Sequence, residues 1–355
     1  MRRMRILVIL AVCLAGFVVS PVVFAQRVVV KLGTLAPEGS PWHDILLQMK
    51  EDWSRISDGK VVVRIYPSGV LGGETDMIRK MRIGQIQAVA ISGPALQRLE
   101  PGVACLQIPL MVESYEEFDY VRDRIAPRLE GLLLERNFRV LSWGDAGWVH
   151  FFTKSPAKTL QDIRNMKLLT AAGDPVVENL YKDFGFRVIP LPYTEVLTAL
   201  QTGLIEAVQG PPLYALLEQW FGLAGNMIDI KWTPLVAATV IREDTWDRVR
   251  PEWREGMLEA AQAAGVRMRT EIRKLGDDAV PEMRKRGLNV VTVDEANFAG
   301  WQEEADKAYP KLRGEYAPAD LFDEVKRLRD EFRRLSAGAA AGAAAGKATG
   351  WREPE

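Results

Sequence analysis

Hydrophobic residues follow two different spacings along the first part of the chain. Runs of β-branched residues at 28–33 and 61–66 are typical of buried strands. Between them, apolar side chains recur every three or four residues from Trp42 to Ile56, as on one face of a helix, and Ser40 can cap that helix. Further helices are expected near 74–83 and over 115–135, and further strands over 86–92 and 138–143. Because strands and helices alternate, the fold class is predicted to be α/β, with a largely parallel sheet covered by helices.

The alternation of strands and helices starts again at residue 159. Thr159 and Asp162 can form a capping box at the start of a helix. Strands are expected at 166–170, 187–190, 204–209, 235–241 and 288–292, and helices at 174–185, 194–202, 211–220, 251–286, from 294, and 321–335. Pro281 is expected to kink the longest of these helices. Alanine and glycine dominate from Ser336 onward, so residues 336–355 are predicted to form a flexible tail.

One short pattern occurs twice in the sequence. The segment Gly84 to Val89 leads into Ser92-Gly93-Pro94, and the segment Gly203 to Val208 leads into Gln209-Gly210-Pro211. Each copy is typical of a helix that ends at a left-handed glycine, a short buried strand and a tight turn that starts the next helix. Such a repeat predicts two similar lobes whose strand ends face each other across a cleft. The alternative is that any α/β protein repeats this order of elements.

The first 25 residues have the layout of a secretory signal peptide. Arg2, Arg3 and Arg5 precede an apolar run over 6–19, and the small residue Ala25 closes the segment. Such a signal peptide would direct export to the periplasm, and cleavage after Ala25 would release the mature protein there. The alternative is an uncleaved membrane anchor.

Composition narrows the possible functions. The chain has 355 residues, which suggests two domains, and its 46 lysines and arginines nearly balance 47 aspartates and glutamates, so charge does not indicate a nucleic-acid partner. Two histidines and two cysteines argue against a zinc site or a disulfide framework, and Cys105 lies in an apolar stretch typical of core. The sequence has no phosphate-binding loop, dinucleotide fingerprint, metalloprotease motif or nucleophile elbow. We therefore expect no metal, no cofactor and no enzymatic activity.

Aromatic residues near predicted strand ends indicate a binding pocket. Trp143 and Trp148 flank a glycine-rich segment that we expect to be a turn at the end of a strand, and Phe151 follows it. Glycines between large flat side chains suit a loop where a ligand approaches the backbone. Tyr193, Tyr214 and Trp220 stand near other predicted turns and could line the same cleft. The alternative for each of these aromatics is plain core packing.

Several short segments occur in an order that is specific to one family. They are Ser57-Asp58-Gly59-Lys60, Tyr66-Pro67-Ser68-Gly69, Leu71-Gly72-Gly73-Glu74, Met81-Arg82-Ile83-Gly84, Ile108-Pro109-Leu110, Val140 to Gly144, Leu191 to Glu195 and Ala199 to Gly203. In these segments the chain resembles the DctP-type extracytoplasmic solute-binding subunits of tripartite ATP-independent periplasmic (TRAP) transporters. The resemblance covers nearly all of residues 27–335.

The resemblance implies a two-lobed periplasmic solute-binding protein fold, with hinge strands that cross between the lobes and a long helix that braces both. We expect residues 27–149 and 235–270 in lobe I, and residues 150–234 and 271–335 in lobe II. Hinge closure would enclose a small-molecule solute, which then passes to the membrane subunits of a TRAP permease driven by an ion gradient. We expect a monomer, with a dimer as the alternative.

The chain departs from the family at positions that usually bind organic acids. Leu169 stands where an arginine is usual, and Val149 or His150 stands at a second basic position. Without a guanidinium, a buried carboxylate ligand would lack its natural partner. We therefore predict a largely apolar or neutral solute, with Gln209 as a polar anchor. The alternative is an organic acid that binds through other basic residues, such as Lys167.

The predicted ligand-binding residues are Trp143, Trp148, His150, Phe151, Leu169, Tyr193, Gln209 and Tyr214. A third possibility is an exported enzyme on the same two-lobed scaffold, because a fold alone does not determine a function.

Overall fold

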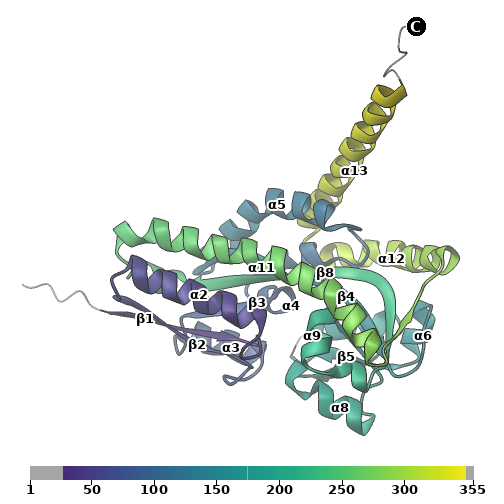
Figure 1. The fold of residues 1–355 in the computed structure, drawn as a ribbon, viewed down its shortest axis with the longest axis horizontal. Helices are drawn as coiled ribbons and strands as arrows, with labels where there is room; N and C mark the ends of the chain where they lie inside the picture. The colour runs from purple at the N-terminus through teal and green to yellow at the C-terminus, as the bar shows by residue number, and fades with distance from the viewer. Residues whose placement is uncertain (1–26, 174, 349–355) are drawn as a thin grey trace, which may run out of the picture.

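The computed structural model describes residues 27–173 and 175–348 as an α/β molecule built on one sheet (Figure 1). The predicted signal peptide, residues 1–25, lies outside the described residues. Within the described ranges, no helix combines the length and the apolar character that crossing a membrane requires.

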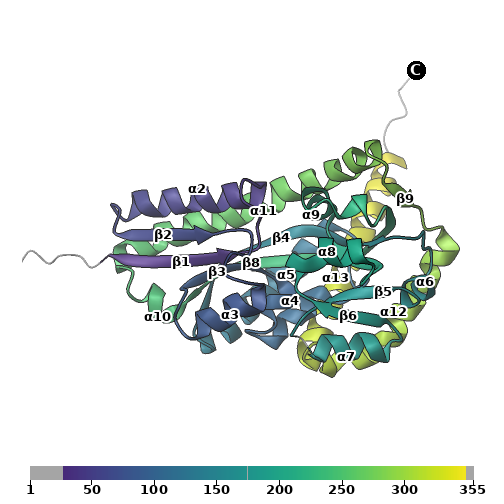
Figure 2. The same cartoon turned by 90° about the horizontal axis from the view of Figure 1, so that it is seen from below.

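The nine-stranded sheet has the order β2-β1-β3-β8-β4-β7-β5-β6, with β9 paired to β8. Its two central strands, β4 (Phe138–Thr153) and β8 (Asn226–Arg242), are antiparallel to each other. On each side of them, three outer strands run parallel to one another. We term β1, β2 and β3 with their helices the first half of the molecule, and β5, β6 and β7 with theirs the second half. Figure 2 shows the two halves at opposite ends of the sheet.

The first half contains the elements that the hydrophobic pattern predicts up to residue 135. Its strands are β1 (Val28–Thr34), β2 (Val61–Tyr66) and β3 (Ala88–Ser92), and its helices are α2 (Pro41–Ile56), α3 (Glu74–Arg82), α4 (Gly93–Leu96), the 3₁₀ helix η1 (Pro101–Gln107) and α5 (Tyr115–Glu135). Ser40 Oγ accepts a hydrogen bond from the backbone N–H of His43 at 3.3 Å, which confirms the predicted cap. The apolar face of α2, from Trp42 to Trp53, is buried.

The second half repeats this order of elements. Its strands are β5 (Lys167–Ala171), β6 (Arg187–Leu191) and β7 (Ala207–Gly210), and its helices are α6 (Leu160–Arg164), α7 (Pro175–Asp183), η2 (Tyr193–Glu195), α8 (Val196–Thr202), α9 (Pro212–Leu217) and η3 (Trp220–Gly222). The predicted capping box of Thr159 and Asp162 is present. Gly84 and Gly203 have left-handed φ angles of 76° and 72°, so each stands at the end of a helix, as the repeated pattern predicts.

The two central strands are longer than predicted. The segment predicted to be a glycine-rich turn, Trp143 to Trp148, is a bulge within β4, where the pairing with β8 shifts between Asp145 and Trp148. Gly147, at φ 96°, adopts a backbone conformation that other residues rarely reach. Strand β8 begins at Asn226 rather than at 235. A glycine-rich segment looks like a turn in the sequence, but pairing with a partner strand keeps the chain extended.

A 35-residue helix, α11 (Pro251–Lys285), lies along both halves (Figures 1 and 2). Its first part buries Met257 in a core of the first half, and its last part buries Met283 in a core of the second half. At Gly265 the helix approaches β4 so closely that a Cβ atom would lie 2.5 Å from the Trp143 carbonyl oxygen. This contact places the middle of α11 directly on the central strands.

The last helices differ from the prediction in two respects. They are α12 (Glu295–Glu315) and α13 (Ala319–Ala348), and the short elements α10 (Glu243–Trp246) and β9 (Asn289–Val291) flank α11. Helix α13 buries Leu321 and Phe322 in the same core as Phe118 of α5, so it packs on the first half and not on lobe II as expected. The predicted tail from Ser336 continues as helix to Ala348, because alanine has the highest helix propensity. The mobility of this segment stays a prediction.

Candidate ligand-binding site

A cavity of about 300 Å³ lies between the two halves, at the carboxyl ends of the outer strands. Thr34 of β1 and Ser92 of β3 line it on one side, and Thr170 of β5 and Gln209 of β7 line it on the other. Ligands of α/β proteins bind at this edge of the sheet, where the strands end. The position of the cavity agrees with the cleft that the repeated sequence pattern predicts.

Four aromatic side chains, Trp42, Tyr193, Tyr214 and Trp220, form one wall of the cavity, which we term the aromatic wall. Tyr214 lies edge-on to Trp220, with 5.0 Å between ring centroids, and edge-on to Trp42 at 6.1 Å. Tyr193 stacks on Trp220 at 6.2 Å. Trp42 belongs to the first half and the other three to the second, so the wall is complete only when the halves are in contact.

Four of the predicted ligand-binding residues line the cavity: Leu169, Tyr193, Gln209 and Tyr214. Leu169 is buried on β5 and presents an aliphatic side chain at the position where the family resemblance expects an arginine. Gln209 bonds to the hydroxyl of Tyr181, which lies 3.2 Å from Oε1 and 3.1 Å from Nε2. Tyr181 also lines the cavity. Tyr181 was not among the predicted residues, because the sequence around a tyrosine on a helix does not indicate which strand its side chain will contact.

The other four predicted residues, Trp143, Trp148, His150 and Phe151, do not line the cavity. Trp143 is buried in a core of the first half, and its Nε1 donates a hydrogen bond to Glu130 at 2.7 Å. Trp148 lies in the same core and packs against Tyr115, with 5.4 Å between ring centroids. The bulge in β4 therefore places both tryptophans in a core rather than beside a ligand.

His150 and Phe151 lie further along β4 and are also core residues. His150 Nδ1 is 3.2 Å from the carbonyl oxygen of Ile228, and burial lowers the pKa of this histidine, so its ring is neutral at neutral pH. Phe151 packs against Trp232 at 5.4 Å between ring centroids. Successive side chains of a strand point to opposite faces, so Val149 lines the cavity while His150 does not.

A half-buried acidic residue, Glu74, lines the cavity at the first position of α3. Its Oε1 accepts a hydrogen bond from the Ser92 backbone N–H, and its Oε2 accepts one from the Ser92 hydroxyl, both at 2.7 Å. Burial raises the pKa of Glu74, while the bonds from Ser92 and the charge of Arg98 oppose this rise. The Arg98 guanidinium, however, donates its hydrogen bonds to Thr75 and to the Ala172 carbonyl. The sequence analysis did not select Glu74, since one glutamate at a helix start is usually exposed.

The basic residues near the cavity offer little free positive charge. Among the described residues that line the cavity, Arg164 is the only arginine or lysine. Its Nη2 donates to Glu304 at 2.7 Å, and its buried Nε has no hydrogen-bond partner. Lys167, expected as the alternative partner of a carboxylate, does not line the cavity, and its Nζ donates to the Gly203 carbonyl at 3.0 Å.

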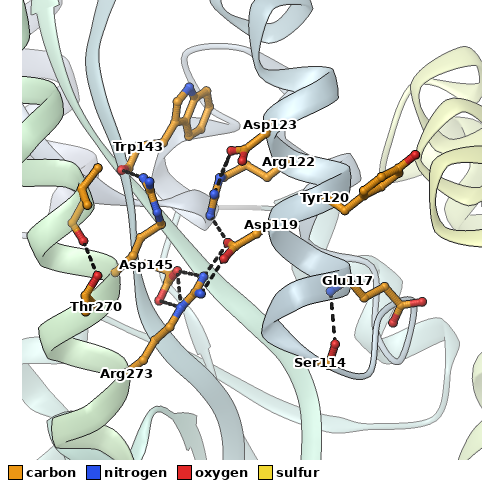
Figure 3. Close-up of polar contacts among 12 residues, drawn as sticks. Ser114, Glu117, Asp119, Tyr120, Arg122, Asp123, Trp143, Asp145, Thr270 and Arg273 are labelled. Carbon is orange, nitrogen blue, oxygen red and sulfur yellow. Dashed lines mark hydrogen bonds and ion pairs between the residues drawn. The ribbon is translucent and has the colours of Figure 1, made fainter. Parts of the chain in front are cut away.

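A second buried acid, Asp145, lines the cavity but belongs to an ion-pair cluster (Figure 3). Arg273 of α11 donates Nη2 to Asp145 Oδ2 at 2.6 Å and to Asp119 Oδ1 at 2.7 Å. Arg122 pairs with Asp119 from the other side. The cluster joins α5, β4 and α11 at the bulge of β4, and the Asp145 side chain is wholly inaccessible. Its charge is therefore neutralised within the protein.

Hydrogen bonds join the two halves at the rim of the cavity. Arg98 Nη2 donates to the carbonyl oxygen of Ala172 at 3.1 Å, and Arg98 Nη1 donates to Thr75 Oγ1 at 2.6 Å. Arg98 and Thr75 belong to the first half, whereas Ala172 follows β5 of the second. Nearby, a Cβ atom on Gly69 would lie 3.3 Å from the methyl group of Thr194 across the cleft. The structure is therefore a closed arrangement of the two halves.

Comparison with known proteins identifies the family. The family model described as DctP, bacterial extracellular solute-binding protein, family 7, matches residues 32–315. A solute-binding protein of Roseobacter denitrificans is 26% identical over 298 residues, which cover 83% of this chain and 91% of that protein. The ectoine-binding periplasmic protein TeaA of Halomonas elongata is 22% identical over 273 residues, covering 74% of this chain and 80% of that protein.

A solved structure has the same fold. A TRAP periplasmic solute-binding protein from Xanthobacter autotrophicus, with bound β-D-galacturonate, matches with a TM-score of 0.78 and 20% identity, covering 85% of this chain and 99% of that one. This match confirms the predicted α/β periplasmic solute-binding protein fold with its long helices. The chain therefore belongs to the DctP family of bacterial extracellular solute-binding proteins, as a non-enzymatic solute-binding protein.

Proposed function

We propose that this receptor captures a small, largely apolar or neutral solute in the cavity and delivers it to the membrane subunits of a TRAP permease. The lining supports this ligand class, because the aromatic wall and Leu169 are prominent in it. The one guanidinium in the described part of the lining, that of Arg164, is already paired with Glu304. A carboxylate buried without a free cation would cost on the order of 3–5 kcal/mol.

Capture requires the two halves to separate and to close again. Strands β4 and β8 and helix α11 are the elements that continue from one half to the other, so we assign the hinge to them. The rim bonds from Arg98 and Thr75 to Ala172 would hold the closed form around the solute. Their rupture would accompany release at the permease. The N-terminal segment would direct export of the receptor to the periplasm. The relative TeaA of Halomonas elongata is likewise named a periplasmic protein.

An organic acid is the second candidate solute, and the comparisons favour it over a neutral one. The Xanthobacter structure holds a sugar acid, galacturonate. In this cavity, Arg164 Nε, Gln107 Nε2 and Thr170 Oγ1 are buried polar atoms without a hydrogen-bond partner among the described residues. Buried donors are normally satisfied, and the oxygens of an acid could satisfy these three.

Native mass spectrometry of the protein purified from its own cells tests the proposal, because a retained solute identifies the ligand class. The proposal expects a retained solute without a carboxylate, and no change in melting temperature on addition of D-galacturonate. A retained acid would overturn the apolar or neutral class in favour of the second candidate. Conversion of the retained solute during incubation would indicate an enzyme instead.

A pair of arginine variants separates the two ligand classes further. If an acid binds at Arg164, galacturonate should raise the melting temperature of the wild type, and Arg164→Gln should abolish that rise. Arg187→Gln is the matched control, since Arg187 is exposed on β6 and its Nη1 bonds only to a backbone carbonyl, that of Asn165, at 3.1 Å. The control should behave like the wild type.

A further inference from the structure

We propose that the solute carries an organic ammonium group, which binds between the Glu74 carboxylate and the aromatic wall. This inference rests on the proposed function and adds the chemistry of the polar end of an otherwise apolar solute. Glu74 and all four aromatic residues of the wall line the same cavity.

Glu74 presents hydrogen-bond acceptors without a cationic partner. Both of its oxygens accept bonds from neutral donors of Ser92, at 2.7 Å each. The two neutral donors of Ser92 do not cancel the negative charge of the ionised carboxylate, so this charge can still attract a cation in the cavity. The nearest positive charge, Arg98, is directed to Thr75 and Ala172 at the rim. Among the described residues, the half-buried carboxylate of Glu74 therefore has no ion-pair partner, and a ligand cation could supply one.

The other acidic residues of the lining do have cationic partners. Among the described residues, the acids that line the cavity are Glu74, Asp145 and Glu304. Asp145 is paired with Arg273 at 2.6 Å. Glu304 is paired with Arg164 at 2.7 Å and with Lys307 at 3.1 Å. Glu74 is the one that the protein leaves uncompensated.

The aromatic wall lines the same cavity as Glu74 and could present ring faces to a cation. The ring planes of Tyr214 and Trp220 meet at 89°, and those of Trp42 and Tyr214 meet at 74°. These edge-to-face contacts cover part of the ring surfaces, and the ring faces that stay open to the cavity could contact an alkylammonium ion. Burial raises the pKa of Tyr193 and of Tyr214, and the nearby charge of Glu74 adds to both rises, so the two hydroxyls lie within its field.

A cation bound between Glu74 and the aromatic wall would also contact both halves of the molecule. Glu74 and Trp42 belong to the first half, whereas Tyr193, Tyr214 and Trp220 belong to the second. A ligand that contacts both sides binds the closed form better than the open form and so shifts the population toward closure.

Choline and its uncharged isostere 3,3-dimethyl-1-butanol test the proposal by calorimetry on the full mature chain. The two probes have nearly the same shape and differ by one positive charge. We expect choline to bind at least about tenfold more tightly than the isostere, in line with a cation–π and carboxylate contact. Benzyltrimethylammonium serves as a second, more apolar cation.

Two variants test the residues. Glu74→Gln keeps the shape of the side chain and should reduce the preference for choline about tenfold, while the affinity for the isostere stays unchanged. Glu116→Gln, on the exposed side of α5, is the matched control and should bind like the wild type. Tyr214→Phe should retain choline binding and Tyr214→Leu should lose it. Circular dichroism confirms that each variant is folded.

Each outcome has one meaning. Equal binding of choline and its isostere, no effect of Glu74→Gln, or failure of both ammonium probes to bind would overturn the ammonium proposal. If a retained solute without positive charge binds to wild type and Glu74→Gln alike, this inference fails and the receptor function stands. If the protein retains no solute and binds none in a broad screen, the proposed function itself fails.

Discussion

Two carboxylates in the cavity wall, the half-buried Glu74 and the buried Asp145, have opposite surroundings. Asp145 lies at the bulge of β4 and is paired with Arg273, which also binds Asp119 (Figure 3). Glu74 lies at the start of α3 and, within the described ranges, accepts hydrogen bonds only from the neutral donors of Ser92. Burying a charge costs free energy unless a partner compensates it. At Asp145 the protein supplies the cationic partner itself; at Glu74 we infer that the solute supplies it.

The largest expected effect comes from removing the compensation at Asp145. Arg273→Gln leaves the buried Asp145 without its cationic partner, while Asp119 keeps Arg122, so we expect a loss of about 3–5 kcal/mol in the free energy of unfolding. Urea denaturation measures it. Arg267→Gln on the same helix is the control, because its pair with Glu271 is half exposed and should contribute less than about 0.5 kcal/mol. Equal effects of the two substitutions would show that the Asp145 pair is no more than a surface ion pair.

A smaller effect is expected from the titration of Glu74. Burial raises its pKa above the usual 4.5, so the folded protein binds this proton more tightly than the unfolded chain does. Stability therefore falls as pH rises above about 4.5, where the unfolded carboxyl ionises, and stops falling once the folded group has ionised too. Without ligand, Glu74→Gln should thus gain stability relative to wild type between pH 4.5 and pH 7. Urea denaturation at both pH values checks this, and a difference that stays constant would contradict the raised pKa of Glu74.

The smallest effect is expected at Arg98, the cation nearest to Glu74. Arg98→Gln removes the hydrogen bond to the Ala172 carbonyl, a contact present only when the halves are closed. A net loss of about 0.5–1.5 kcal/mol would weaken solute binding by up to roughly tenfold and leave the free energy of unfolding nearly unchanged. Calorimetry with the retained solute measures the affinity, and urea denaturation measures the free energy of unfolding. Arg79→Gln is the control, because Arg79 forms an exposed ion pair with Asp76. If this control weakened solute binding as much as Arg98→Gln does, the rim contact of Arg98 would have no specific role in closure.

Much of the fold could be predicted from local pattern. Helix α5 has the bounds that apolar spacing predicts, and the caps at Ser40 and Thr159 use residue types whose side chains bond to nearby backbone. The full lengths of β4 and β8 could not be predicted, because their extension through Gly147 depends on pairing between segments far apart in the sequence. The packing of α13 on α5 likewise depends on a distant partner.

The candidate site was only partly predictable. Tyr193, Tyr214, Gln209 and Leu169 stand at strand ends or turns, and all four line the cavity. Trp143, Trp148, His150 and Phe151 have equally suggestive sequence neighbours, but the pleat and the bulge of β4 direct them into cores. Glu74 and Tyr181 gave no local signal, since neither residue type is unusual on a helix.

The sequence by itself determined the family, the alternation of strands and helices, and the lack of an arginine at Leu169, because short-range pattern and residue identity are properties of the chain alone. Only the tertiary structure decided which carboxylates are compensated. Arg273 lies 128 residues from Asp145 in the sequence, and Ser92 lies 18 from Glu74, so spacing along the chain predicts neither contact. Charge compensation depends on distances in space, and folding sets those distances by burying apolar surface elsewhere.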